Sequence, residues 1–269
     1  MIGLLKKILT ALRYILSKNN ISNLVFVYYK KISVPKKIVS GYEVDMDIVA
    51  KRYLSGVKNY NSTVLLNDFI ARENISFLEK SIRKIGFRVE EGMKFLDVGC
   101  GNGFYGKIIK KKGSIFEDVD YAGCEFHPKL VEVCKKLNPN FVFFLSRAEK
   151  IDSPDNFYDF VFSSGVLHYT LRNWKKSVLE FKRVSKSFIF ITRIPLSKYE
   201  KTFYVQQKVW SISGIETHYF VVPNRDVFEN FLVRNGLEIL ERDYSLEEYI
   251  INGVKEKIIL SNYFLRKVN

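Results

Sequence analysis

Three glycines at alternate positions, Gly99, Gly101 and Gly103, follow a short apolar segment that contains a carboxylate, Asp97. The segment, residues 94–98, has the composition of a buried parallel strand, and the residues after the glycines have helical spacing. Glycine lets the chain turn sharply and lets a ligand approach main-chain N–H groups that a Cβ would shield. We therefore predict a nucleotide-binding turn between a strand and a helix.

Two cofactor classes suit such a turn. The spacing Gly101-x-Gly103-x-x-Gly106 also fits the dinucleotide pattern, in which a pyrophosphate rests on a helix N-terminus. An anionic pyrophosphate gains nothing from a carboxylate at the strand end, whereas a cationic sulfonium and an amino group favour one. Asp97 therefore favours S-adenosylmethionine, and a nicotinamide cofactor stays open as the alternative.

A second acid, Glu125, lies at the end of the next predicted strand, residues 120–125. Its distance along the chain from the glycine turn is about that at which a Rossmann-type fold has a carboxylate for a ribose diol. Phe126 would then lie against the adenine ring. The alternative is a solvated carboxylate ahead of a helix, but the combination with the glycine turn favours the ribose role.

The segment from Asp97 to Gly103 resembles the first motif of class I S-adenosylmethionine-dependent methyltransferases, and residues 159–169 resemble their fourth-strand motif. The resemblance spans residues 92–265 and implies S-adenosylmethionine as the cofactor. The residues that it implies for cofactor binding are Asp97, Gly99, Cys100, Gly101, Asn102, Gly103, Glu125, Phe126, Arg147, Ala148 and Ser164. Arg147 departs from the family, which often has an acid there for the adenine amino group, so the backbone at this position would make the contact.

The same resemblance places His168 and Tyr169 near the methyl acceptor. His168 is a candidate base for a hydroxyl nucleophile because the ordinary pKa of imidazole is near neutrality. The alternative is a histidine packed at a helix entrance. Arg193, at the end of a predicted strand, would hold a phosphate or carboxylate of the acceptor or would form an ion pair with a local acid.

Beyond residue 92, apolar strand segments alternate with helical segments, which indicates an α/β fold with a mostly parallel sheet and helices on both faces. The predicted strands are 94–98, 120–125, 141–146, 159–164, 187–193, 237–244 and 256–264. The predicted helices are 103–112, 128–137, 173–184 and 225–235. The last connection is short and suits an antiparallel hairpin. The resemblance implies a Rossmann-like doubly wound sheet of seven strands.

The first 42 residues hold eight Lys or Arg residues and no acid. Apolar residues at helical spacing within residues 2–18 predict a basic amphipathic helix, which either lies on an anionic membrane surface or packs against protein. Charges interrupt its apolar run too often for a transmembrane span. Residues 21–31 are apolar, aromatic and β-branched and are predicted to be a second short packing segment. We divide the chain into a basic amphipathic extension (1–40), a helical lead-in (41–91) and a Rossmann-like methyltransferase domain (92–269).

Composition narrows the function less than the motifs do. An apolar content of 47% and an aromatic content of 15% exclude a disordered chain. The three cysteines lack metal-ligand spacing, so no metal site is predicted, and they suit a reducing cytoplasm. The net charge of +14 suits nucleic acid, anionic lipid, an acidic substrate or a merely Lys-rich chain. Basic groups such as Lys182 and Arg183 are expected to be solvated.

These observations predict a transferase that methylates an oxygen or nitrogen nucleophile. Segments around Arg193 and His218 resemble, less specifically, enzymes of bacterial surface-polysaccharide and lipopolysaccharide clusters. That resemblance implies a sugar or glycolipid hydroxyl as acceptor, a substrate wall at residues 196–217, and a cytoplasmic enzyme held peripherally at the inner membrane face. A nucleic-acid methyltransferase stays open, although no Asn/Asp-Pro-Pro-Tyr motif follows the fourth strand, and so does a non-catalytic protein of this fold.

Overall fold

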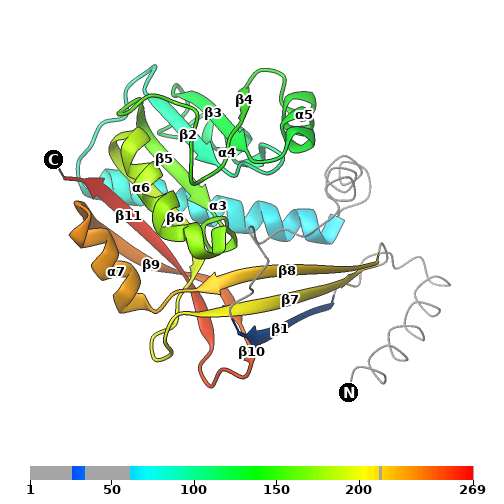
Figure 1. Cartoon of the computed structure of the whole chain (residues 1–269). Coiled ribbons are helices and arrows are strands. Elements are labelled where there is room, and N and C mark those ends of the chain that lie inside the picture. Colours follow the sequence, from blue (N-terminus) through cyan, green and yellow to red (C-terminus); the bar gives the residue numbers. More distant parts are fainter. Residues whose placement is uncertain (1–25, 34–60, 212–213, 269) are drawn as a thin grey trace.

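The computed structural model describes residues 26–33, 61–211 and 214–268, and a seven-stranded sheet forms its centre (Figure 1). In spatial order the strands are β4 (Val142–Leu145), β3 (Asp120–Glu125), β2 (Lys94–Val98), β5 (Tyr158–Ser164), β6 (Ser185–Pro195), β11 (Ile258–Lys267) and β9 (Leu237–Tyr249). β11 runs antiparallel to β6 and β9, whereas the pairs from β4 to β6 are parallel. The predicted α/β class is confirmed.

Side chains alternate along the strands and give this sheet two different faces. Phenylalanines gather on one face: Phe95, Phe160, Phe162, Phe188 and Phe190. They lie under α3 (Asn61–Lys84), α4 (Phe104–Ile109) and α5 (Pro128–Leu137). Leu96, Val161 and Ile189 face α6 (Trp174–Val184) and α7 (Arg225–Arg234) on the other side. Since both faces of its central strands are buried, β2, β5 and the middle of β6 carry apolar side chains at neighbouring positions.

A second sheet of four strands lies in the order β10 (Ile251–Asn252), β1 (Phe26–Ile32), β7 (Phe203–Ser211) and β8 (Gly214–Val222). β8 packs against η1 (Leu167–Asn173), the 3₁₀ segment that follows the carboxyl end of β5. The inner cluster of this sheet includes Val205, Phe220 and Ile251, with Tyr169 and Tyr249 packed against it. The second sheet therefore lies next to the edge of the central sheet where a ligand is expected.

This second sheet was not predicted. β1 lies within the N-terminal extension, where residues 21–31 were expected to form a short packing segment, and residues 26–32 form a strand there. The segment Val27-Tyr-Tyr29 is β-branched and aromatic, which favours a strand, and it pairs with β7 along its whole length. β7 and β8 cover much of the predicted substrate wall at residues 196–217. The predicted amphipathic helix at residues 2–18 lies outside the described residues.

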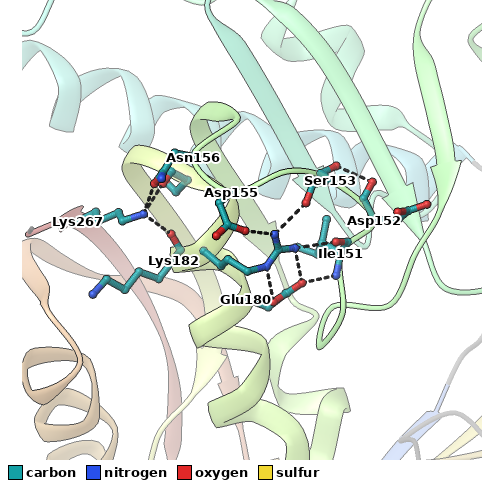
Figure 2. Close-up of polar contacts among 10 residues, drawn as sticks. Ile151, Asp152, Ser153, Asp155, Asn156, Glu180, Lys182 and Lys267 are labelled. Carbon is teal, nitrogen blue, oxygen red and sulfur yellow. Dashed lines mark hydrogen bonds and ion pairs between the residues drawn. The ribbon is translucent and has the colours of Figure 1, made fainter.

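Figure 2 shows polar contacts that hold α6 to the loop before β5. The Arg183 guanidinium contacts four residues of this region: Ile151, Ser153, Asp155 and Glu180. Lys267 Nζ of β11 donates to the carbonyl oxygens of Lys182 and Ser185, each at 3.0 Å. Lys182 Nζ in turn donates to the carbonyl oxygen of Asn235 at 2.7 Å. The expectation that Lys182 and Arg183 are solvated is wrong, because backbone carbonyls at the ends of neighbouring segments bind them.

Every strand and helix predicted beyond residue 92 is present, with its ends within a few residues of the predicted ones. The predicted antiparallel hairpin is formed by β9 and β11. The helical lead-in contains α3 as its described part. In the part of the chain that the structure describes, no helix has the length and apolar character needed to cross a membrane.

Candidate active site

The glycine turn joins β2 to α4 where the strand order reverses between β2 and β5. Gly99, Gly101 and Gly103 have φ values of 73°, 62° and 75°, a region that favours glycine. The N–H of Gly99 donates to the carbonyl oxygen of Cys124 at 2.8 Å and holds the turn against β3. A Cβ on Gly99 would lie 2.4 Å from Cγ2 of Val166, so the β5–η1 connection approaches the turn as closely as glycine allows.

Glu125 ties the end of β3 to the same turn. Its Oε1 accepts the N–H of Gly101 at 2.8 Å, and its Oε2 accepts the N–H of Phe126 at 3.0 Å. Burial raises the pKa of Glu125 to about 7, although both backbone hydrogen bonds oppose the shift. A carboxylate accepts about four hydrogen bonds. Both oxygens of Glu125 therefore keep acceptor positions for the hydroxyls of a ribose.

Asp97, on β2 beside Glu125, is 1% exposed. Burial raises its pKa to about 7; the Tyr121 phenol, which donates to Oδ2 at 2.8 Å, opposes this, and the charge of Glu125 adds to it. Two buried carboxyl groups on neighbouring strands cost free energy when both are ionised. A cationic ligand at this edge would lower the pKa values of both carboxyl groups. The site therefore favours a cation, as the sequence predicts.

The other residues predicted for the adenosine part lie around the turn and after β4. Cys100 is buried, and the side chain of Asn102 accepts the main-chain N–H two residues further on at 3.1 Å. Phe126 is partly exposed. Arg147 is exposed and pairs at 2.7 Å with the acid two residues further on, while Ala148 is buried. The guanidinium of Arg147 is thus engaged, and contact of its backbone with adenine stays a prediction.

Ser164 belongs to a polar network at the carboxyl end of β5. The hydroxyl oxygens of Ser164 and Tyr105 are 2.8 Å apart, and Asn74 Nδ2 donates to Tyr105 at 2.8 Å and to Ser164 at 3.3 Å. Ser164 was predicted as a site residue, but Asn74 and Tyr105 were missed. The sequence did contain a clue to Asn74, because its amide interrupts the apolar stripe of a predicted helix. In the structure this side chain is buried.

His168 and Tyr169 lie side by side in η1, with their ring centroids 4.3 Å apart. The imidazole of His168 is 2% exposed, and its Nδ1 has no hydrogen-bond partner among the described residues. Burial and the nearby Arg193 lower the pKa of His168 to about 3. At neutral pH this imidazole is therefore uncharged and a weak base. The packing favours the alternative of a structural histidine, and the role of His168 as a base stays a prediction.

Arg193 lies near the end of β6 with φ of 57°, unusual for a residue with a side chain. Its Nε donates to Oε2 of Glu247 at 2.5 Å and its Nη2 to Oε1 at 2.8 Å, which makes a bidentate pair. The guanidinium lies beside the β5–η1 turn, because a Cβ on Gly165 would be 3.3 Å from Nη1. The structure thus has the predicted alternative, an ion pair with a local acid, next to the fourth-strand motif.

Three tyrosines surround this ion pair. Tyr29 of β1 stacks on Tyr249 of β9 with ring centroids 4.6 Å apart, and each interacts electrostatically with both Arg193 and Glu247. Tyr169 interacts with the same pair. Burial raises the pKa of all three phenols, that of Tyr169 to about 12, so they are neutral donors at pH 7. We call these five residues the acceptor cluster.

The inner face of the second sheet adds further polar groups beside the acceptor cluster. The Tyr169 hydroxyl donates to Oε1 of Gln207 at 3.1 Å, and Gln207 is paired in register with His218 on β8. His218 Nε2 lies 3.4 Å from Oε2 of Glu216. Sequence reasoning missed Gln207 and Glu216 as site residues. The clue in the sequence was that residues in a strand alternate between the two faces of a sheet. In a strand over this segment, residues 216, 218 and 220 lie on one face.

Comparison with known proteins gives a family match to this region. Residues 96–188, about a third of the chain, match the family described as a methyltransferase domain. The chain therefore carries a methyltransferase domain. This match supports a transferase enzyme, with S-adenosylmethionine as the predicted methyl donor. A search of curated proteins finds no match.

Solved structures of methyltransferases share the fold at low sequence identity. A S-adenosylmethionine-dependent methyltransferase from Clostridium acetobutylicum is 10% identical with a TM-score of 0.56, over 83% of this chain and 99% of that one. Magnesium protoporphyrin IX methyltransferase from Synechocystis has a TM-score of 0.55 at 10% identity, with 83% and 92% covered. The 1,6-didemethyltoxoflavin-N1-methyltransferase of Burkholderia thailandensis has 0.54 at 11%, with 90% and 95% covered.

The residues of the turn fit this cofactor. There is no room for a side chain between Gly99 and Val166. The main chain of the glycine turn therefore lies directly against the β5–η1 connection. Glu125 keeps free acceptor positions, and Asp97 offers a second buried carboxyl group for the cationic part of the donor. A dinucleotide pyrophosphate would face the buried Asp97 carboxyl group at the strand end, so Asp97 disfavours the nicotinamide alternative.

Proposed function

We propose that the enzyme transfers a methyl group from S-adenosylmethionine to a hydroxyl of a sugar or of a glycolipid precursor of a surface polysaccharide. The acceptor cluster carries this proposal. The Arg193–Glu247 pair has no net charge, so it offers donors and acceptors without selecting an anion. Tyr29, Tyr169 and Tyr249 add apolar ring surface with polar tips. A neutral, hydroxyl-rich acceptor uses all of these groups, whereas a nucleic acid would find no surplus of positive charge in this cluster.

We infer the following roles on the donor side. Glu125 accepts the ribose hydroxyls, Asp97 faces the cationic methionine part, and Phe126 lies against adenine. The remaining donor-side residues shape the turn and its rim through their backbone or small side chains: Gly99, Cys100, Gly101, Asn102, Gly103, Arg147, Ala148 and Ser164. The tie between Glu125 and Gly101 supports this assignment, since it sets the carboxylate against the turn before any ligand binds.

When bound, S-adenosylmethionine supplies an electrophilic methyl group on a sulfonium. The chain's own contribution is then to hold the acceptor oxygen in line and to exclude water, which accounts for most of the acceleration in such reactions. Arg193 and Tyr169 orient the acceptor. His168 Nδ1, which has no partner among the described residues, is the atom that we propose takes the hydroxyl proton, although the packing of this imidazole favours a structural histidine. With the pKa of His168 lowered to about 3, this step contributes a smaller factor than positioning.

We further propose that the chain is divided into three parts, namely the basic extension 1–40, the helical lead-in 41–91 and the methyltransferase domain 92–269. The enzyme acts in the cytoplasm, and residues 2–18 hold it at the inner face of the membrane, where glycolipid precursors are assembled. Apolar residues at helical spacing and the absence of acids in the first 42 residues support this placement.

Calorimetric titration tests the cofactor and then the acceptor. S-adenosylhomocysteine should bind at micromolar concentration and NAD should not, and Glu125→Ala should weaken binding more than tenfold, because charge-assisted hydrogen bonds contribute about 1.5–3 kcal/mol each. Sugar nucleotides and lipid-linked sugars are titrated next, in the presence of S-adenosylhomocysteine. The variant Tyr29→Phe, which removes one hydroxyl of the acceptor cluster and keeps its ring, is titrated in parallel. Binding of RNA but of no sugar would replace the proposed acceptor class with nucleic acid.

A further inference from the structure

Two segments meet beside the second sheet, the loop 197–201 and residues 250–257, which include the edge strand β10, and we call them the tip surface (Figure 1). Glu256 joins the two segments: its carboxylate accepts the N–H of Lys198 at 3.0 Å and the N–H of Tyr199 at 3.1 Å. At the end of β1, Lys31 Nζ lies 2.8 Å from Oε2 of Glu200. The tip surface is thus a braced part of the fold.

The tip surface carries the two most exposed large apolar side chains of the described residues. Tyr199 is 75% exposed and Ile250 is 72% exposed. A single exposed apolar side chain on a soluble protein needs no explanation. Both lie on the tip surface, whose two segments are joined through Glu256, and two exposed apolar groups of this size favour burial against a partner.

The tip surface and the adjoining end of β1 also carry a surplus of positive charge. Its acids are already engaged: Glu200 pairs with Lys31, and the Glu256 carboxylate accepts main-chain N–H groups. Four exposed lysines here have no salt bridge with another described residue: Lys30, Lys198, Lys201 and Lys255. The surface therefore carries more lysines than acids, together with the exposed apolar groups.

We propose that the tip surface docks the protein on an anionic lipid bilayer. Lysines reach lipid headgroups, tyrosine suits the membrane–water boundary, and an aliphatic side chain inserts below it. Phosphates of a nucleic acid would engage the lysines but would leave Ile250 in water. Tyr249, the residue before Ile250, stacks on Tyr29 of the acceptor cluster. Docking would therefore bring the acceptor cluster close to the lipid headgroups. The docking proposal itself does not rest on the proposed function.

Vesicle co-sedimentation of the full chain tests this docking. Vesicles of phosphatidylcholine with 30% phosphatidylglycerol (about one lipid in three, the charge range in which polybasic segments bind) are compared with phosphatidylcholine alone. Charge reversal of Lys198, Lys201 and Lys255 should lower the partition coefficient on the order of 10,000-fold, since each reversal changes the charge by two units and each unit contributes about fivefold. Ile250→Ser should lower it about tenfold. Matched controls reverse Lys111, Lys112 and Lys136 or replace Val233, which is exposed on α7, with Ser.

Binding of S-adenosylhomocysteine confirms that each variant is folded, and it separates a failure of docking from a failure of the proposed function. Wild-type protein that ignores anionic vesicles would overturn the proposal. So would binding that survives both tip variants but is lost in Leu5→Asp with Leu9→Asp, because the N-terminal segment would then be the membrane contact. A labelled single-stranded RNA that needs the tip lysines, with vesicles unaffected, would assign the surface to nucleic acid.

Discussion

Gly103 and Gly92 have nearly the same backbone conformation, φ of 75° and 76°, but different surroundings. A Cβ on Gly92 meets nothing within 4 Å, whereas one on Gly103 would lie 2.6 Å from Nδ2 of Asn138 and 2.7 Å from Cζ of Phe143. Alanine at either position carries the left-handed strain, about 1–2 kcal/mol. Gly103→Ala adds overpacking of about 1–3 kcal/mol, because Asn138 is buried and bonds main-chain oxygens.

Urea unfolding measures this difference, and Gly103→Ala should lose about 2 kcal/mol more than Gly92→Ala. Asn138 Nδ2 donates to the carbonyl oxygen of Asn102 at 2.8 Å, so displacing it also moves the glycine turn. Calorimetry should therefore show weaker S-adenosylhomocysteine binding in Gly103→Ala only. Equal losses of stability in the two variants, with unchanged binding in both, would refute the close packing behind the turn.

Three further predictions concern charged groups. Because burial raises the pKa of Asp97 and of Glu125 to about 7, each carboxyl holds its proton longer when folded. The free energy of unfolding should then fall as pH rises from about 4 to 7, while S-adenosylmethionine affinity should rise from pH 6 to 8; Asp97→Asn should flatten both curves. Glu247→Gln leaves Arg193 without its anion and should cost about 2 kcal/mol in urea unfolding, and a loss below about 0.5 kcal/mol would contradict the pairing. Arg183→Lys removes two carbonyl hydrogen bonds and should lower the unfolding free energy by about 2 kcal/mol, whereas Lys186→Arg, nearby and exposed, should leave it unchanged.

The central sheet was predictable because its signals are local. Central strands that are buried on both faces contain apolar runs, and β2, β3 and β5 end at or next to a glycine or an acid that the sequence also shows. Asp97, Gly101 and Glu125 were found for the same reason, since a turn of fixed geometry demands those residue types at fixed spacing. The structure places Gly101 and Glu125 in hydrogen-bond contact.

The second sheet was not predictable in the same way, because its pairing is long-range. β1 and β7 are joined in register from Phe26↔Trp210 to Ile32↔Tyr204, about 170–180 residues apart along the chain. β10 is two residues long and pairs with β1 only because the β9–β11 hairpin brings it there. No local pattern indicates such partners, so the sequence predicted only a short packing segment where β1 lies and a substrate wall where much of β7 lies.

Donor and acceptor specificity therefore come from different parts of the chain. The match to the methyltransferase domain family covers residues 96–188, which hold the glycine turn, Glu125 and η1. Of the acceptor cluster, only Tyr169 lies within that range; Tyr29, Arg193, Glu247 and Tyr249 lie outside it. A family match of this extent can identify the methyl donor but carries little information on the acceptor. In the function that we propose, the packing of β1 and β9 against the end of the central sheet selects the acceptor.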